Sequence, residues 1–257
     1  MVVWDESAYH TSPVIDVTLA GTPVTPIVAR FDVSSSLLEK AETVVLELAD
    51  YNRIITGSVK RGDQLFIKWG YVGQEMVEIF RGVVRSIGVD DPVVIRGIDY
   101  NAILNSKRIQ KTFEDETASG IIRAVMAGTG LGLEIEECAV EIDRLPLFNQ
   151  TLRESLDTIT EIVKTESREQ YYDYIREGIL HWGKKEISGE AQCAFRLGYN
   201  IIRQEVCPDG VEFLETLVTP VRHSEIIEVE GEKMFVVKVE YLWEGGGRTR
   251  IWYEHAG

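Results

Sequence analysis

The chain has 257 residues, of which 44% are hydrophobic and 27% are charged, and its formal net charge is −15. This composition excludes collagen-like, low-complexity and wholly disordered chains, because its apolar content can offset the entropy cost of ordering the backbone. The length suits one large domain or two to three small ones. The acidic balance argues against sequence-independent binding to DNA or to anionic membranes, since like charges repel at long range.

Cysteine usage and the first residues indicate where the protein is made. Cys138, Cys193 and Cys207 are far apart and form no CxxC pair. Neither a disulfide framework nor a cysteine-based zinc site is therefore expected. The first residues lack the apolar core of a signal peptide, and no run reaches the roughly 18 apolar residues of a membrane helix. We expect synthesis and folding in the cytoplasm, without membrane insertion.

The first hundred residues show the alternation of apolar and polar residues that is typical of half-buried strands. In residues 14–20, for example, Ile15, Val17 and Leu19 alternate with polar residues. Similar runs, each closed by turn residues, cover residues 27–33, 43–48, 60–70, 77–87 and 93–98. So many short strands in one segment predict a small β-barrel or sandwich.

The pattern then changes to that of amphipathic helices. A first helix is predicted between Thr117, its N-cap, and Gly128, its C-terminal stop. A second helix is predicted to begin at Thr151, because Thr151 and Glu154 form a capping-box pattern. With a short strand predicted at residues 131–135, this part of the chain is expected to be a mixed α/β region.

Strand patterns return in the last third of the chain. Turns are predicted at Glu177-Gly178, at residues 208–210 and at the glycine-rich residues 245–247. The strands beside these turns cover residues 171–176, 179–182, 200–206, 211–218, 237–241 and 249–253. The C-terminal part is therefore also predicted to be β-rich.

These strands contain a weak internal repeat. In both copies an acidic turn leads into a strand, then a long strand, a turn and a closing strand. The first copy covers residues 62–67, 80–84 and 93–95, and the second covers residues 224–229, 235–239 and 249–251. A repeat changes the expected architecture. It predicts two similar antiparallel β-barrel domains that flank the α/β region.

No catalytic, cofactor-binding or metal-binding residue is predicted. The four histidines lack HxH, HExxH or another metal-ligand spacing, and the G-x-S-x-G nucleophile motif is absent. Neighbouring carboxylates could form the acid pair of a glycosidase, but a solvated face is the better interpretation in so acidic a chain. The residues concerned are His10, His181, His223 and His255 and the carboxylates Glu134, Glu136, Glu137, Glu141 and Asp143.

Three further motifs favour structural interpretations. Gly128, Gly130 and Gly132 mimic a nucleotide-binding loop, but they follow a helix and open a strand, whereas a dinucleotide fingerprint does the reverse. The integrin-like Arg61-Gly62-Asp63 fits a tight β-turn. Aromatic residues that could stack sugars or bases stand at strand spacing, which favours core or interface positions. They are Tyr171, Tyr172, Tyr174, Trp182, Trp243, Trp252 and Tyr253.

Several segments resemble, in order and spacing, the phage tail baseplate hub proteins of the late control protein D and myovirus type. This family is related to the hub part of type VI secretion spike proteins. The similar segments are the Gly62-Asp63 turn and residues 79–84 (IFRGVV), 94–100 (VIRGIDY), 117–131, 147–152 (LFNQTL), 197–202 (LGYNII), 217–220 (LVTP), 235–241 and 249–253. The resemblance covers most of the chain, from about residue 12 onward.

The resemblance implies a structural subunit that is not an enzyme and needs no cofactor. Members of the family form a trimeric ring with two tube-like barrels in each chain, which joins the sixfold tail tube to the threefold spike. The implied partners are further copies of this chain, the tail tube or distal tail protein, the spike and, as another candidate, the tape measure protein. Sequence-specific nucleic-acid binding is not expected. The implied location is the baseplate of a virion tail, after synthesis in the bacterial host cytoplasm.

We therefore expect an α+β, mostly β fold in three parts. The first tube-like barrel is predicted at residues 1–98, the α/β middle region at 99–196, and the second barrel at 197–257, with part of the middle region as a possible addition. The expected function is a hub subunit of a phage or prophage-derived tail that lets DNA pass, which suits the acidic composition. A tail-associated cell-wall hydrolase or a carbohydrate-binding receptor module is the alternative.

Overall fold

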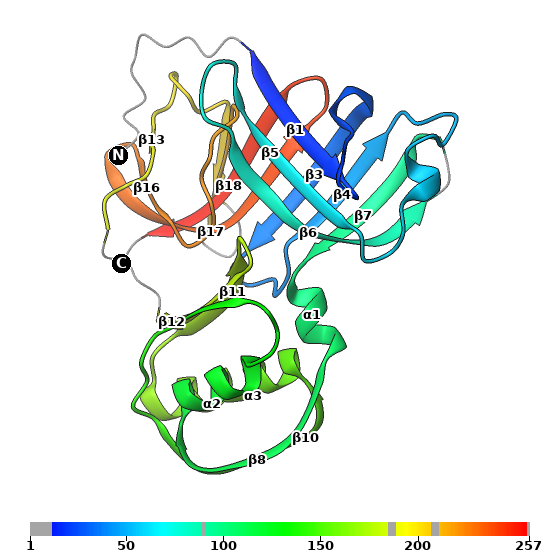
Figure 1. Cartoon of the computed structure of the whole chain (residues 1–257). Coiled ribbons are helices and arrows are strands. Elements are labelled where there is room, and N and C mark those ends of the chain that lie inside the picture. Colours follow the sequence, from blue (N-terminus) through cyan, green and yellow to red (C-terminus); the bar gives the residue numbers. More distant parts are fainter. Residues whose placement is uncertain (1–11, 89–90, 185–188, 207–210, 256–257) are drawn as a thin grey trace. The chain divides into compact units, whose positions relative to one another are not determined.

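The computed structural model describes residues 12–88, 91–184, 189–206 and 211–255. The chain divides into two compact units (Figure 1). Unit 1 combines Met1–Asp99 with Glu186–Gly257, and unit 2 is Tyr100–Lys185. The fold is mostly β with short helices, as the sequence predicts. In the described part of the chain no helix has the length and apolar character needed to cross a membrane.

The N-terminal strands of unit 1 follow the predicted alternation closely. Leu65, Ile67 and Trp69, which share one face of a strand, are all buried. The elements are β1 (Pro13–Leu19), β2 (Thr22–Pro23), the 3-10 helix η1 (Thr25–Ile27), β3 (Val28–Ser36), β4 (Thr43–Leu48), η2 (Thr56–Ser58), β5 (Gln64–Tyr71), β6 (Val77–Gly88) and β7 (Val93–Asp99). The strand predictions for this segment are confirmed.

The C-terminal part of unit 1 contributes six more strands among the residues described. They are β13 (Ala194–Phe195), β14 (Arg203–Val206), β15 (Glu212–Thr216), β16 (Ile226–Val229), β17 (Glu232–Trp243) and β18 (Gly247–His255). The predicted turn at residues 208–210 lies outside the described residues. The glycine-rich hairpin is confirmed, since Trp243 pairs with Gly247 across the turn.

The two parts of unit 1 share one sheet. Among the described residues, thirteen strands follow the order β14-β15-β18-β17-β3-β4-β7-β6-β5-β1-β2, with β16 beside β17 and β13 beside β16. Every pairing is antiparallel except that of β13 with β16. The buried side chains of both parts form one continuous apolar core. The two parts are therefore joined by strand pairing and by a shared interior.

Unit 2 has its own core and its predicted helices. Thr117 accepts a hydrogen bond from the Gly120 amide (3.2 Å), and Thr151 and Glu154 form the predicted capping box. The elements are α1 (Asn101–Ser106), β8 (Arg108–Thr117), α2 (Ala118–Met126), β9 (Gly132–Ile135), β10 (Glu141–Thr151), α3 (Leu152–Ser167), β11 (Tyr171–Arg176) and β12 (Ile179–Lys184). The strand at β9 and the hairpin of β11 and β12 are also confirmed.

The sequence pattern missed α1 and a long antiparallel ribbon formed by β8 and β10. Phe113 of β8 and Leu147 of β10 point into the core of unit 2, but most of the other residues in these two strands are polar and exposed. A two-stranded ribbon covers its core with few apolar residues, so its alternation is weak. This is why the strands escaped prediction.

Candidate functional site

Unit 1 contains the same six-stranded arrangement twice, which confirms the predicted repeat at the level of topology. The first half has the sheet order β3-β4-β7-β6-β5-β1, and the second half has β14-β15-β18-β17-β16-β13. When the strands of each half are numbered along the chain, both orders are the same. The halves differ at their last strand, because β1 pairs with β5 antiparallel whereas β13 pairs with β16 in parallel.

The match between the halves extends to single hydrogen bonds in the turn before β5 and β16. In the first half the Lys60 amide donates to the Asp63 carboxylate (2.7 Å), and in the second the Arg222 amide donates to the Glu225 carboxylate (2.9 Å). The residue before each acid, Gly62 or Ser224, has a positive φ of 94° or 67°. The acidic turn seen in the sequence therefore has the same structure in both halves.

The long middle strand of each half carries a β-bulge at the same place. In β6 the register with β7 shifts between Val84 and Ser86, and in β17 the register with β18 shifts between Val236 and Lys238. Val84 and Val236 also exchange equivalent backbone bonds with the acidic turns. A bulge bends and twists its strand. These shared positions define which residues of the two halves correspond.

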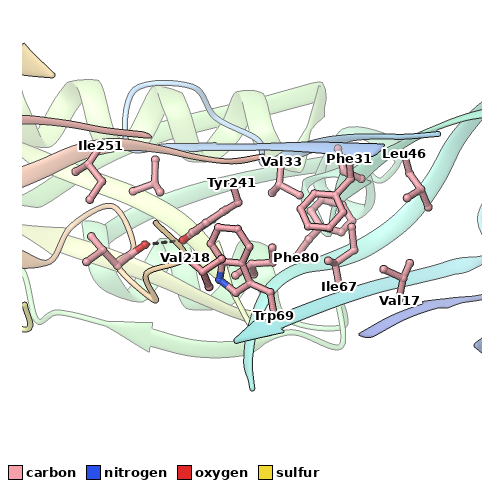
Figure 2. Close-up of a cluster of buried hydrophobic side chains, with 14 of the residues drawn as sticks. Val17, Phe31, Val33, Leu46, Ile67, Trp69, Phe80, Val218, Tyr241 and Ile251 are labelled. Atoms are coloured by element: carbon pink, nitrogen blue, oxygen red, sulfur yellow. Dashed lines mark hydrogen bonds between the residues drawn. The ribbon is translucent and has the colours of Figure 1, made fainter. Parts of the chain in front are cut away.

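The two halves meet where β17 pairs with β3, a contact that we call the half-sheet junction. Tyr241 of β17 lies opposite Val33 of β3. Tyr241 packs edge-on against Trp69 at a centroid distance of 5.0 Å, and its hydroxyl donates to the Val221 carbonyl (2.7 Å; Figure 2). Aromatic pairs of this geometry add to the stability that burial provides. The second half therefore completes the core of the first.

Charged side chains line the outer face of β17 and of the neighbouring strands β15 and β18. Lys238 lies 3.0 Å from Glu240, and Arg250 lies 2.9 Å from Glu215. The hydrogen bond to Glu215 raises the pKa of Arg250. Burial raises the pKa of Asp32, and the nearby Glu240 carboxylate adds to that effect. Opposite charges on neighbouring strands help to fix the register of the sheet.

The histidines lie at separate places, and none belongs to a metal-binding group among the described residues. His181 Nδ1 lies 2.9 Å from Glu134 Oε2, and its pKa is lowered by burial against the opposing effect of Glu134. His223 is buried beside the Ser224 hydroxyl (2.8 Å). His255 pairs loosely with Glu232, and His10 lies outside the described residues.

Three acidic residues of the predicted solvated face, Glu134, Glu136 and Glu137, have individual partners in unit 2. Glu137 pairs with Arg123 (2.7 Å), whose hydrogen bond lowers the pKa of this carboxyl. Glu136 accepts a hydrogen bond from the Lys184 amide (2.7 Å). Glu141 and Asp143 are exposed on β10. The arrangement supports local ion pairing and surface charge.

The glycine motif and the tripeptide have the structural roles expected of them. Gly128 and Gly130 follow α2 with φ angles of 80° and 84° and lead into β9. This is the positive-φ backbone of a helix C-terminus and turn, a conformation that favours glycine. Gly62 and Asp63 of the tripeptide form the acidic turn described above.

Three of the seven aromatic candidates are buried. Tyr171 and Trp182 stack at 4.7 Å in the core of unit 2, and the Trp182 indole donates to Thr160 (3.0 Å). Tyr253 is fully buried in unit 1. The remaining candidates are Tyr172, Tyr174, Trp243 and Trp252, all half-buried. None of the seven is presented as an exposed platform for a sugar ring.

A shallow hollow of about 580 Å³ opens to solvent along α3. Its lining residues are Asp157, Thr158, Glu161, Ile162, Thr165 and Glu166. Small-molecule sites are usually enclosed and apolar with a few convergent polar groups. An open acidic helix face of this kind does not resemble such a site.

Sequence reasoning missed a group of exposed apolar side chains on unit 1. Tyr51 and Ile54, between β4 and β5, are 75% and 79% exposed, and Ile202 and Val206, at β14, are 51% and 74% exposed. Alternation alone cannot reveal them, because it does not show which strand edges lack a neighbour. Superimposing the two halves of unit 1 reveals Val206, because it falls on the position of Val33, which is buried in the first half.

Comparison with known proteins gives matches in structure only. No protein-family model matches the chain, and no curated protein matches its sequence. The 43 kDa tail protein of prophage MuSo2 from Shewanella oneidensis is similar at 13% identity and a TM-score of 0.72, with 94% of this chain and 98% of that chain covered. A tail protein from Neisseria meningitidis is similar at 12% identity and a TM-score of 0.72, with 95% and 96% covered.

A component of the E. coli type VI secretion system is also similar, at 10% identity and a TM-score of 0.66, with 93% of this chain and 76% of that chain covered. That protein is described as structurally similar to the T4 bacteriophage tail proteins gp27 and gp5. The expected resemblance to tail hub proteins is therefore confirmed for the fold. The chain has the fold shared by these phage tail proteins and this type VI secretion component.

Proposed function

We propose that this protein is a structural baseplate hub subunit of a phage or prophage-derived tail. The observation that carries the proposal is the doubled six-stranded half in one sheet, joined through the half-sheet junction. A chain with two equivalent halves can present six similar positions when three copies form a ring. Such a ring matches a sixfold tube on one side and a threefold spike on the other.

The proposed domains and partners follow from this arrangement. Residues 1–98 provide the first tube-like barrel, and residues 197–257, together with β13 of the preceding segment, provide the second. The rest of residues 99–196 forms the α/β region between them along the chain. The partners are two further copies of this chain, the tail tube or distal tail protein, the spike and the tape measure protein. The subunit is made in the bacterial host cytoplasm and assembles into the virion tail. Its similarity to tail proteins and to a type VI secretion component supports this role.

A structural role also fits the chemistry of the described side chains. Glu137 and Glu134 are engaged with Arg123 and His181, and the aromatic candidates Tyr171, Trp182 and Tyr253 are packed in the two cores. A cell-wall hydrolase needs a free acid pair or an activated nucleophile, and a glycan-binding module needs exposed aromatic faces. Neither arrangement is evident in the described residues, so we place the structural role ahead of both alternatives.

The decisive measurement is the mass of the purified protein as its concentration is raised. Light scattering should give a trimer, and electron microscopy should show rings with a central channel. A protein that stays monomeric at all accessible concentrations would contradict the ring. Clearing of peptidoglycan in a zymogram, or selective binding on a glycan array, would instead support the hydrolase or the receptor module.

A further inference from the structure

The half-sheet junction shows how one half binds another. The first residues of β17 pair with β16, and beyond the bulge the same edge of β17 pairs with β3, from Lys238 opposite Ser36 to Trp243 opposite Phe31. One edge of β17 therefore pairs with its own half at its start and with the first half beyond the bulge. The contact is antiparallel and places Val239 and Tyr241 over the shared core.

Among the described residues, the corresponding edge of the first half has no neighbouring strand. β6 pairs with β5 up to Val83, and Val84 bonds to the acidic turn, as in the second half. Beyond the bulge, Ser86–Gly88 pair only with β7, and no described strand lies on their other side. These three residues correspond to Lys238–Glu240 of β17. The first half therefore ends in the same docking edge, and no strand among the described residues occupies it.

The matching acceptor edge also has no neighbour in the described part of the chain. β14 corresponds to β3, because each is the strand that pairs with the fourth strand of the sheet order, β15 or β4. β14 is the terminal strand of the sheet among the described residues. Unpaired backbone groups on an edge strand favour the addition of another strand.

Side-chain burial supports the same correspondence. Val33 of β3 is fully buried opposite Tyr241, whereas its counterpart Val206 is 74% exposed. Across the bulge positions, Ile87 of β6 corresponds to Val239, since each pairs with a fully buried isoleucine, Ile95 or Ile251. The β14 edge thus leaves exposed the position that the contact inside the chain buries, as expected if a second contact of the same kind covers it.

The loops beside the two edges add to this surface. In the second half the loop between β15 and β16 reaches the first half, where the Arg222 guanidinium donates to the Glu78 carbonyl (2.8 Å). The corresponding loop of the first half, between β4 and β5, carries the exposed Tyr51 and Ile54. The repeat therefore places Tyr51 and Ile54 at the position where the second half has a loop that contacts the other half.

We propose that the β6 edge and the β4–β5 loop of one copy dock on β14 of a second copy and repeat the half-sheet junction between chains. This inference rests on the proposed ring and identifies its contact surface. We take a second copy as the occupant, because this chain carries both the donor edge on β6 and the matching acceptor edge on β14. The contact is heterologous, so each copy binds one neighbour through each half and the series can close.

The first test places a charge in the proposed junction. Val206→Glu should raise the protein concentration at half-assembly by roughly tenfold or more, because the new carboxylate would be buried against β6 of the neighbour. The matched control is Phe148→Glu in unit 2, which adds the same charge at a side chain that is 61% exposed. This control should assemble like the wild type. Both variants should keep the wild-type circular dichroism spectrum, since the altered side chains are exposed.

The second test measures proximity directly. In the half-sheet junction Val239 and Val33 are diagonal neighbours on one face, a relation that corresponds to about 7–8 Å between strands. Ile87→Cys combined with Val206→Cys, with Cys207 replaced by serine, should therefore give covalent oligomers with a short bismaleimide. The control pair combines Ile87→Cys with Phe148→Cys and should give none above the level of the single variants.

The outcomes separate this inference from the proposed ring. If the wild type assembles but Val206→Glu assembles equally well and the cysteine pair does not cross-link, the copies meet through another surface and this junction is wrong. If the wild type remains monomeric at every concentration, the ring itself is wrong, and the junction with it. Loss of assembly in Val206→Glu together with specific cross-linking supports both.

Discussion

A buried ion pair in unit 2 illustrates what single residues contribute to this protein. Arg153 of α3 and Asp173 of β11 have side chains that are 7% and 0% exposed, and their closest atoms are 2.5 Å apart. Arg153 also lies 2.7 Å from Asp157. Its pKa is raised because these two carboxylates outweigh the effect of burial. The sequence did not indicate this pair, since an arginine near a helix start is usually exposed.

Replacing Arg153 with methionine should lower the free energy of unfolding of unit 2 by about 3–5 kcal/mol, because the Asp173 carboxylate would stay buried without the guanidinium. Hydrogen exchange of the α3 amides would measure the change. The control is Arg144→Met, whose side chain is 73% exposed and 3.7 Å from Glu114. That variant should change stability by less than about 0.5 kcal/mol. Equal effects of the two substitutions would refute the structural account.

A second residue gives unit 1 a dependence on pH. The Asp50 carboxylate accepts hydrogen bonds from the Thr56 amide (2.7 Å) and hydroxyl (2.7 Å) and from the amides of Ile54 and Ile55. These bonds, that of the Thr56 amide first, lower the pKa of Asp50. The carboxylate therefore stabilises the fold above the unfolded pKa of about 3.9, and this contribution is lost as the pH falls through the lower folded pKa.

Asp50→Asn should therefore be less stable than the wild type at pH 7, and the difference should narrow at pH 3 and below. Urea midpoints of both proteins over this range would show it. The physical reason is that protonation removes from the wild type the same charge that the substitution removes. A difference of constant size down to pH 2 would argue against the role of Asp50.

At the scale of elements, the glycines in the segments that resemble hub proteins have a packing explanation. Gly82 of β6 lies opposite Asp99 of β7, and a Cβ atom at Gly82 would meet the Ile98 carbonyl oxygen at 2.2 Å. A Cβ atom at Gly97 would meet Val44 Cγ1 at 2.6 Å. Gly82 thus allows β6 to approach the β7 backbone closely, and Gly97 leaves room for the Val44 side chain of β4.

Gly82→Ala should destabilise unit 1 by about 1–3 kcal/mol or more, because the obstructing atom is backbone and cannot rotate away. Thermal or urea unfolding would measure the loss. The matched control is Gly246→Ala, where a Cβ atom would meet nothing within 4 Å. It should leave the midpoint nearly unchanged. A Gly82→Ala protein as stable as this control would show that the strands can separate at little cost.

Elements were predictable where their signals are local. The cap at Thr151 and the turn at Glu177-Gly178 depend on neighbouring residues alone, and both are confirmed. The ribbon of β8 and β10 depends on contact with helices elsewhere in the chain, so its few apolar residues did not stand out. The same holds for the proposed contact surface. The sequence showed the acidic turns, which are local, but it did not show that β14 would lie at the end of the sheet.

At the scale of the whole molecule, the net charge of −15 makes a prediction about DNA. A wall that DNA must pass works best without strong phosphate binding, and a negatively charged protein repels the duplex. Gel shifts at about 50 mM salt, where electrostatic binding is strong, should show no retardation of duplex DNA at micromolar protein. Tight binding that weakens steeply with salt would contradict the proposed passage of DNA.

The sequence by itself determined the β-rich class, the two capped helices and the repeat, because alternation, capping and turn chemistry act over a few neighbouring residues. Only the tertiary structure decided that both halves share one sheet and one core, and that β17 pairs with β3 while β6 and β14 have edges without a partner strand among the described residues. Strand pairing joins residues about two hundred positions apart, such as Phe31 and Trp243. No local pattern specifies such a partner, since every strand edge offers the same backbone groups.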